Sequence, residues 1–321
     1  MAIHYLTYRE IDKSKWDNCI DHAANGSIYA CSFYLDAMAK HWDALVLNDY
    51  EAVMPLTWNK KYGIYYLYQP PFTACLGIFG DQLSAGTVNE FLKAIPAKFS
   101  YWDIYLNPGN LFQLTGLHLY ERMNYVLQLN EPYEKLHDHY RDNIKRNIKK
   151  AEKLDLTINK NIALAEVILL VREQLKKFTD IAAKDFENFK GLYQILYKKE
   201  KATTYGVYSK EGQLLAAAVF FFYRQRAYYI MVGNHPNGKT LGASHALINA
   251  FIKDHAGQSL LLDFEGSDIP SLAHFYSSFG AKEEKYAAVR LNRLPFWLKW
   301  VKKAESQFPA TSIFVRVRLM A

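Results

Sequence analysis

LLAAAVFFFYRQRAYYIMV, residues 214–232, is the stretch that decides the fold. It consists of two apolar, aromatic runs, Leu214–Tyr223 and Ala227–Val232, separated by a short polar break. A third run, Thr204–Tyr208, precedes them across a polar turn. Short runs of β-branched and aromatic residues with such breaks are typical of antiparallel strands. The sequence therefore predicts a meander of three strands.

The chain after the meander predicts alternating helices and strands. A polar loop, GNHPNGKTLG (residues 233–242), comes first. The elements expected beyond it are a helix over Ala243–His255, a strand over Ser259–Phe264, a helix over Ile269–Phe279 and a strand over Tyr286–Leu291. Gly280 ends the second helix, as glycine often does. The fold class is therefore α/β with mixed sheets.

Upstream of the meander lies an unusually basic stretch, YRDNIKRNIKKAEK, Tyr140–Lys153. Its apolar residues recur at spacings of three and four, which places them on one face of a helix starting near Pro132. The opposite face aligns Lys145, Lys149 and Lys153, with Arg146 and Lys150 beside them. Like charges four residues apart cost a helix about 0.2–0.5 kcal/mol per pair. An anionic ligand would explain them, and a solvated face is the alternative.

Residues 1–135 read as a second mixed region. Helices are expected over Lys13–His22, Ser32–Ala39 and Thr87–Phe99, and strands over His4–Tyr8, Ala44–Leu47, Ala52–Trp58, Tyr65–Gln69, Trp102–Leu106 and Tyr125–Leu129. Further helices are expected over Leu164–Phe178 and Phe186–Lys199, before the meander. A chain of 321 residues is long for one core, so two domains are expected.

Composition bounds the function loosely. Half of the residues are hydrophobic, and the net charge of +7 suits an anionic ligand, a membrane surface or nucleic acid. Three cysteines show no metal-binding spacing, so no metal is expected, and an odd, low count favours a reducing compartment. The N-terminus lacks the apolar core of a signal peptide, and no apolar run reaches the roughly 20 residues of a membrane helix. We therefore expect a soluble, cytoplasmic protein.

The order of elements resembles the GNAT acyltransferase fold. SDIPSLAHFYSSFGA, Ser267–Ala281, resembles the GNAT helix that carries a tyrosine and closes on a Phe-Gly turn. NIKRNIKKAEK, Asn143–Lys153, is similar to the Arg/Lys–Asn–Ile–x–Lys–Ala motif of the bacterial Fem-type aminoacyltransferases, which extend peptidoglycan bridges. The resemblance implies two GNAT-like domains in tandem, a degenerate one over residues 1–135 and a donor-binding one over 136–310. Residues 311–321 are expected to return to the first domain as a strand.

The resemblance also implies a donor site. A GNAT holds the pyrophosphate of coenzyme A with Gln/Arg-x-x-Gly-x-Gly/Ala, where this chain has Lys239-x-x-Gly242-x-Ser244. The expected donor-binding residues are Met231, Val232, Gly233, Lys239, Gly242, Ala243 and Ser244. No cofactor is expected to be tightly bound, and acyl-CoA or aminoacyl-tRNA is expected as the co-substrate.

Acyl transfer to an amine needs a base, a polarised donor carbonyl and an acid for the leaving group. Tyr276 stands where many GNAT enzymes keep the acid, and Asp263 or Glu265, at the end of a strand, could act as base. Ordinary packing and a solvated strand end are the alternatives. The expected acceptor-binding residues are Lys60, Lys61, Tyr68, Gln69, Lys145, Arg146 and Lys149. The acceptor would be a small-molecule or nucleotide-linked, phosphorylated or cell-wall-precursor-like amine.

Three other functions remain open from the sequence. The changed pyrophosphate motif suits a non-catalytic GNAT-like binding module. The basic and aromatic content suits RNA binding, although the aromatics lie in apolar strand runs rather than in a stacking pattern. The segment Phe296–Lys303 could lie on a membrane surface, but packing against the second domain is the preferred interpretation, so no peripheral membrane contact is expected.

Overall fold

The computed structural model describes residues 2–112, 119–175, 181–266 and 268–294. Contacts divide the chain into two units. The described part of unit 1 ends at Arg122 and resumes at Lys285, and that of unit 2 runs from Met123 to Glu284. The expected strand over 311–321 and the segment Phe296–Lys303 lie outside the described residues.

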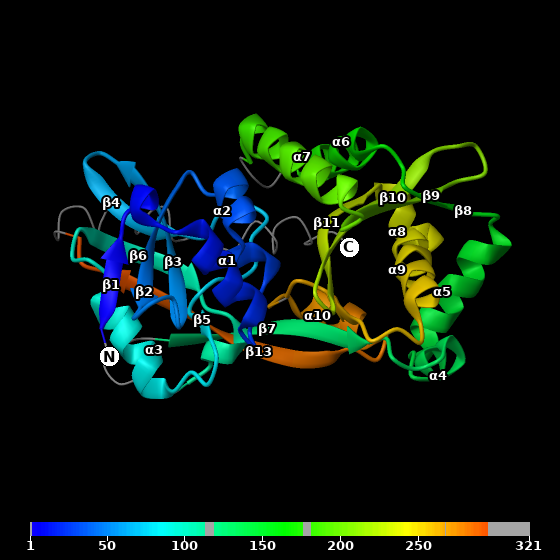
Figure 1. Cartoon of the computed structure of the whole chain (residues 1–321). Coiled ribbons are helices and arrows are strands. Elements are labelled where there is room, and N and C mark those ends of the chain that lie inside the picture. The colour runs from blue at the N-terminus through cyan, green and yellow to red at the C-terminus, as the bar shows by residue number, and fades with distance from the viewer. Residues whose placement is uncertain (1, 113–118, 176–180, 267, 295–321) are drawn as a thin grey trace. The chain divides into compact units, whose positions relative to one another are not determined.

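Unit 1 contains a sheet in the order β1-β2-β3-β4-β6-β13, with β5 paired to β3 (Figure 1). Its strands are β1 (Ile3–Leu6), β2 (His41–Leu47), β3 (Ala52–Lys61), β4 (Ile64–Tyr68), β5 (Phe79–Gly80), β6 (Phe99–Tyr105) and β13 (Lys282–Asn292). Its helices are α1 (Lys13–His22), α2 (Ser32–Met38) and α3 (Ala85–Ala94), with short 3-10 turns at Tyr8–Glu10, Ile28–Ala30 and Pro108–Asn110. The core contains α3 side chains packed on alternate residues of β2 and β3.

Unit 2 contains a sheet in the order β7-β12-β11-β10-β9-β8. Its strands are β7 (Leu119–Gln128), β8 (Thr157–Lys160), β9 (Ala202–Tyr208), β10 (Leu214–Tyr223), β11 (Arg226–Asn234) and β12 (Leu261–Asp263). Its helices are α4 (Tyr133–Asp138), α5 (Asp142–Lys153), α6 (Leu164–Leu175), α7 (Ala183–Lys198), α8 (Pro236–Leu241), α9 (Ala243–His255) and α10 (Pro270–Ser277).

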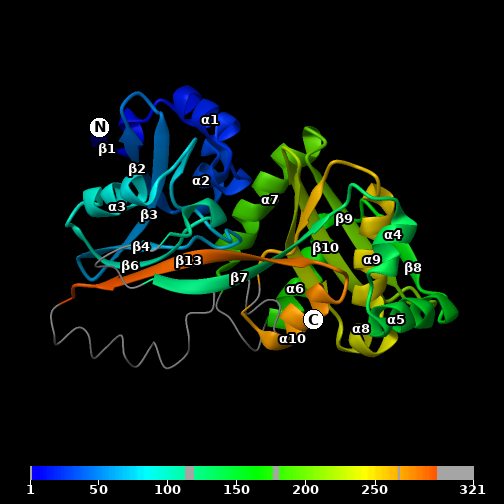
Figure 2. The same cartoon turned by 90° about the horizontal axis from the view of Figure 1, so that it is seen from below.

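Helices cover both faces of the unit 2 sheet (Figure 2). Successive residues of β10 point to opposite faces. Phe221 stacks on Phe189 of α7, whereas Phe220 stacks on Phe251 of α9 with ring centroids 3.8 Å apart. Helix α6 contacts β11 and β10, and α5 packs against α8 and α9. The meander predicted from residues 204–232 is confirmed as β9, β10 and β11.

The two units share one order of strand pairing. In each, three antiparallel strands (β2-β3-β4 or β9-β10-β11) precede a helix (α3 or α9) and a strand that pairs in parallel (β6 with β4, or β12 with β11). One more strand then extends each sheet. In each case this strand follows, along the chain, the parallel strand of the other unit. Thus β13, after β12, pairs with β6, and β7, after β6, pairs with β12. This exchange makes the units differ from the expected ranges 1–135 and 136–310.

Several element boundaries differ from the sequence-based expectation. The helix expected to start near Pro132 is two helices, α4 and α5, because the amide of Arg141 donates to the carbonyl of Ser278 instead of continuing the helix. The helix expected over Thr87–Phe99 ends at Ala94, before Pro96. The polar loop after Val232 contains the short helix α8, whose first residue is Pro236. Proline suits that position because the first helical amide needs no partner.

Candidate donor site

An opening in the pairing of β11 and β12 forms the base of the candidate site. The two strands pair in parallel over three residues only, Arg226 to Tyr228, because β12 ends at Asp263 while β11 continues to Asn234. A bulge at Ile230 bends β11 just beyond this point, where the register with β10 shifts by one residue. Met231 and Val232, two expected donor-binding residues, lie on the part of β11 that has left β12.

Gly233 has a packing reason to be glycine. A Cβ atom there would lie 2.9 Å from the backbone nitrogen of Val171 in α6. Contacts closer than 3.0 Å are not tolerated by real side chains, so the helix can approach β11 this closely only at a glycine. The small residue therefore serves helix–strand packing at least as much as any ligand.

Gly242 joins α8 to α9 in a left-handed conformation, with φ of +78°. A Cβ atom at this position would lie 2.6 Å from the carbonyl oxygen of Asn147 in α5. The start of α9 is thus packed against the backbone of the basic helix. Lys239 lies on α8 with an exposed side chain, and Ala243 is buried.

The end of β11 is joined to the first turn of α9 by side chains. Ser244 Oγ donates to Asn234 Oδ1 at 2.6 Å, and the backbone amide of Asn234 donates to Gln174 Oε1 at 2.7 Å. Asn234 is 6% exposed, and its Nδ2 has no hydrogen-bond partner in the described part of the chain. A buried amide donor without a partner is costly, typically by about 1–3 kcal/mol. It is therefore the side chain here that most needs a ligand.

His245 follows in the same turn and was not singled out by the sequence. Burial lowers the pKa of its imidazole to about 4, so the ring is neutral at pH 7. Its Nδ1 is buried without a hydrogen-bond partner among the described residues, and its ring meets that of Phe275 edge-on at 5.0 Å. The sequence signal that could have identified the two residues is their position around the glycine-containing loop. Asn234 is the last residue of the strand before it, and His245 lies in the first turn of the helix after it.

Tyr276, the expected acid, lies on α10 within the core of unit 2. It is 1% exposed, and its ring stacks on Phe264 with centroids 4.5 Å apart. Phe264 directly follows β12, so the structure brings Tyr276 to the end of that strand, as expected. Because Tyr276 is buried, a donor would have to reach below the surface of the unit to contact its hydroxyl.

Asp263, an expected base, is the buried member of a partly buried ionic cluster. Its carboxylate accepts from Arg226 Nε at 2.7 Å, from Asn124 Nδ2 at 2.9 Å and from the amide of Glu265 at 2.7 Å. Arg226 also pairs with Glu284, and the two carboxylates hold the pKa of its guanidinium well above the usual value against the effect of burial. Three bound donors suit a structural role, which the sequence could not show because Arg226 and Asn124 lie far from Asp263 along the chain.

Glu265 adopts a left-handed backbone with φ of +64°, and Gly266 follows with φ of +83°. Non-glycine residues rarely adopt this conformation, which costs about 1–2 kcal/mol. Asn124 Oδ1 accepts from the amide of Gly266, and Asp263 Oδ1 accepts from that of Glu265, so the ionic cluster holds this turn. Strained non-glycine residues concentrate at functional sites, which keeps Glu265 a candidate.

The acceptor residues expected in unit 1 lie on β3, β4 and the loop after β4. Lys60 is exposed with its Nζ 4.7 Å from the centre of the Tyr65 ring, and Lys61 lies similarly over Tyr62. The hydroxyl of Tyr68 accepts from the amide of Lys40 at 2.8 Å. Gln69 binds the carbonyl of Thr73 and the amide of Tyr105. Both ends of the Gln69 side chain therefore bind backbone groups.

The acceptor residues expected in unit 2 lie on α5. Ile144, Ile148 and Ala151 are buried, which confirms the apolar face. Lys145 is partly covered, and its Nζ donates to the carbonyl of Asp138 at the end of α4. Arg146 and Lys149 are exposed. Of the three expected residues on α5, Arg146 and Lys149 are thus the two whose charges face solvent.

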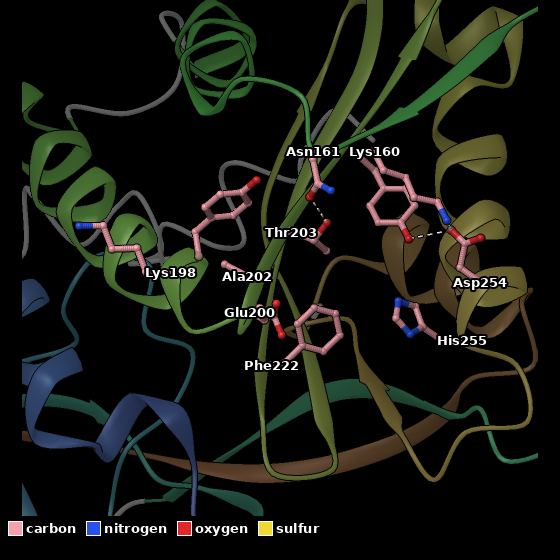
Figure 3. A pocket seen from close by; sticks show the side chains of 11 residues that line it. Lys160, Asn161, Lys198, Glu200, Ala202, Thr203, Phe222, Asp254 and His255 are labelled. Atoms are coloured by element: carbon pink, nitrogen blue, oxygen red, sulfur yellow. Dashed lines mark hydrogen bonds and ion pairs between the residues drawn. The ribbon is translucent and has the colours of Figure 1, made fainter.

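A separate hollow of about 590 Å³ lies at the other end of the unit 2 sheet (Figure 3). It is bordered by the C-terminal ends of α7 and α9, and its polar groups are largely paired. Asp254 Oδ2 accepts from both Lys160 and Tyr205, each at 2.7 Å, and Thr203 donates to Asn161. It contains none of the residues expected to bind donor or acceptor.

Comparison with known proteins defines the class. Residues 138–268 match the family model described as the acetyltransferase (GNAT) domain. Among solved structures, FemX is similar over 94% of this chain and 99% of its own, with a TM-score of 0.63 and 12% identity. L-PGS from Bacillus licheniformis is similar over 92% of this chain and 96% of its own, with a TM-score of 0.56 and 12% identity. None of the curated protein sequences matches this chain.

A third similar structure is the C-terminal domain of a protein assigned as a lysylphosphatidylglycerol synthetase, from Agrobacterium fabrum. It covers 95% of this chain and 98% of its own, with a TM-score of 0.52 and 11% identity. Residues 138–268, within unit 2, therefore form a GNAT-type acetyltransferase domain. Over nearly its whole length the chain has the tandem fold of FemX. The helices in the described ranges include none that is long and apolar enough to cross a membrane.

Proposed function

We propose that this chain transfers an acyl or aminoacyl group from an activated donor to an amine, with the donor bound by unit 2. The observation that carries the proposal is the opening beyond Tyr228, where β11 leaves β12 and continues to Asn234 at the start of the GNAT loop. An extended donor can lie along the freed part of β11. Its phosphates would then meet the amides at the start of α9, since helix N-termini bind anions.

Three groups would fix such a donor. The Nδ2 of Asn234 would supply a hydrogen bond where β11 ends, because it has no partner within the described structure. Lys239 on α8 would supply a positive charge to the phosphates, since its exposed side chain lies in the loop. Ser244 would position Asn234 through its 2.6 Å hydrogen bond. Acyl-CoA is the expected donor of a GNAT domain, and aminoacyl-tRNA is the alternative donor.

The chemistry would take place at the end of β12. The acceptor amine must lose a proton before or as it attacks the donor carbonyl, and the leaving group must gain one. Glu265, held in its left-handed turn, is the proposed base, and Tyr276 is the proposed acid. Asp263 is assigned instead to holding that turn, because Arg226, Asn124 and the amide of Glu265 occupy its carboxylate.

The acceptor is proposed to be a phosphate-bearing amine, small or nucleotide-linked, of the cell-wall-precursor type. Lys60 and Lys61, both exposed, are the proposed phosphate ligands, since lysine binds phosphates well. A bacterial cytoplasm is the proposed location, because both donors are made there. The test is single-turnover transfer to an amine panel with acetyl-CoA and with charged tRNA as donors.

One observation favours a second candidate, a GNAT-like binding module without turnover. The backbone of Asn147 packs against Gly242, so α5 partly covers the loop that binds pyrophosphate in other GNAT domains. Binding of a donor without any transfer in the same assay would support the module and contradict the enzyme.

A further inference from the structure

A stripe of four cations runs along the outer face of α5. Arg146, Lys149, Lys150 and Lys153 are spaced i, i+3, i+4 and i+7, which aligns them on one side of the helix. All four are exposed, whereas Ile144, Ile148 and Ala151 on the opposite side are buried. Helix α5 lies beside α8 and α9 within unit 2 (Figures 1 and 2). We call these four residues the α5 stripe.

The α5 stripe forms no ion pair with any other described residue. None of its four side chains forms an ion pair or hydrogen bond within the described part of the chain. Several exposed lysines elsewhere are paired, for example Lys15 with Asp49 at 2.7 Å and Lys285 with Glu121 at 2.8 Å. Aligned like charges weaken a helix. Their arrangement is therefore unfavourable for folding and suits an external anion.

The surroundings of the α5 stripe favour a lipid surface over nucleic acid. The four residues span roughly 10 Å of helix, and none of them is aromatic, so the stripe offers no ring on which a base could stack. Two exposed apolar side chains follow it directly, Leu154 and Ile158, which are 39% and 38% exposed. A lipid interface accepts cations and apolar side chains together. A phosphodiester backbone accepts only the cations.

We propose that the α5 stripe docks the protein reversibly on an anionic lipid surface. This goes beyond the proposed function, because it holds whether or not the chain transfers an acyl group. It also differs from the expectation of no membrane contact, which considered residues 296–303 and not α5. Each lysine or arginine near an anionic leaflet strengthens binding by about fivefold. Four such residues give weak, salt-sensitive attachment rather than permanent anchoring.

The test is co-sedimentation of the full chain with vesicles. One set contains phosphatidylglycerol and phosphatidylcholine in equal parts, and the other contains phosphatidylcholine alone. The stripe variant carries Arg146→Gln, Lys149→Gln, Lys150→Gln and Lys153→Gln. The control variant carries Lys15→Gln, Lys93→Gln, Lys190→Gln and Lys210→Gln, which removes equal charge from exposed, paired positions. Circular dichroism verifies that both variants fold.

We expect the wild type to bind the phosphatidylglycerol vesicles only. The stripe variant should lose on the order of 10²-fold in partitioning, and the control variant less than about tenfold. Leu154→Ser should weaken binding severalfold at unchanged net charge. Equal losses in both charge variants would overturn the proposal in favour of net charge. Absence of vesicle binding would overturn it too, and stripe-dependent binding of a duplex RNA instead would assign the stripe to nucleic acid.

Discussion

Ser244 Oγ donates a hydrogen bond of 2.6 Å to Asn234 Oδ1, so the first turn of α9 is fastened to the last residue of β11. This bond fixes the rotamer of Asn234 and leaves its Nδ2 directed away from Ser244. Because the proposed donor lies along β11, the bond would set the position of the one amide donor that lacks a partner within the described residues.

Ser244→Ala should therefore weaken donor binding more than it weakens the fold. Loss of one neutral hydrogen bond costs about 0.5–1.5 kcal/mol of stability. The free Asn234 side chain would then sample other rotamers, and the affinity for a bound donor should fall about tenfold. Calorimetric titration with acetyl-CoA measures this. Ser84→Ala, which removes a capping hydroxyl in unit 1, is the control and should leave the affinity unchanged.

Gly242→Ala should be strongly destabilising. The left-handed backbone at φ of +78° and the 2.6 Å approach to Asn147 O both oppose a Cβ atom, and we expect a loss of about 3 kcal/mol. Gly212 is the matched control, since its φ is +81° and no atom lies within 4 Å of a Cβ built there. Gly212→Ala should cost only about 1 kcal/mol. Urea unfolding of both variants measures the difference. Equal losses of stability would mean that α5 shifts enough to accommodate a Cβ atom at Gly242.

Asp263→Asn should destabilise unit 2 by about 3 kcal/mol, because it removes the buried carboxylate that pairs with the partly buried Arg226 guanidinium. Asp49→Asn removes the partner of the exposed Lys15 and should leave the stability nearly unchanged. Thermal unfolding compares the two. A stable Asp263→Asn variant that has lost transfer activity would return Asp263 to the role of base.

The free energy of unfolding should decrease at acidic pH because of the titration of His245. The folded protein keeps this imidazole neutral down to its pKa of about 4, whereas the unfolded chain takes up the proton near the ordinary pKa of 6.5. Protonation therefore favours the unfolded chain. The resulting loss of stability grows as the pH falls from 6.5 to 4 and reaches up to about 3 kcal/mol.

His245→Phe keeps a ring against Phe275 and removes this titration. The free energy of unfolding of the variant, measured by urea at several pH values, should fall less steeply over that interval than that of the wild type. Parallel curves would show that His245 does not titrate differently in the two states.

Tyr276→Phe tests the proposed acid. It removes one hydroxyl from a buried ring stacked on Phe264, so the fold should persist, and the single-turnover rate should drop about 10²–10⁴-fold. Tyr34→Phe, at an equally buried tyrosine of unit 1, is the control and should leave the rate unchanged. A normal rate in Tyr276→Phe would restrict Tyr276 to packing.

The sequence predicts those elements whose causes are local. Helix α1 begins where expected because Asp12 accepts from the amides of Ser14 and Lys15, and α9 begins directly after the left-handed Gly242. The break between α4 and α5 was missed because the amide that ends the helical pattern, at Arg141, is bound by Ser278 from a distant part of the chain. Periodicity continues through such a break, so only the tertiary structure shows it.

The same distinction applies to the site. The loop and the end of β12 could be located from the order of elements and from glycine. The hydrogen bonds of Asp263 with Arg226 and Asn124 could not be predicted, since these partners are 37 and 139 residues away in sequence. Pairings of that separation leave no pattern in the chain itself, and the proposed supporting role of Asp263 rests on them.

Hydrogen exchange measured by mass spectrometry tests the central claim most directly. The full chain is compared alone, with saturating acetyl-CoA, and with charged tRNA. The account predicts slower exchange over residues 229–246, which include the freed part of β11, α8 and the start of α9, with one of the two donors. Unchanged exchange there with both donors would contradict a donor site at the end of β11.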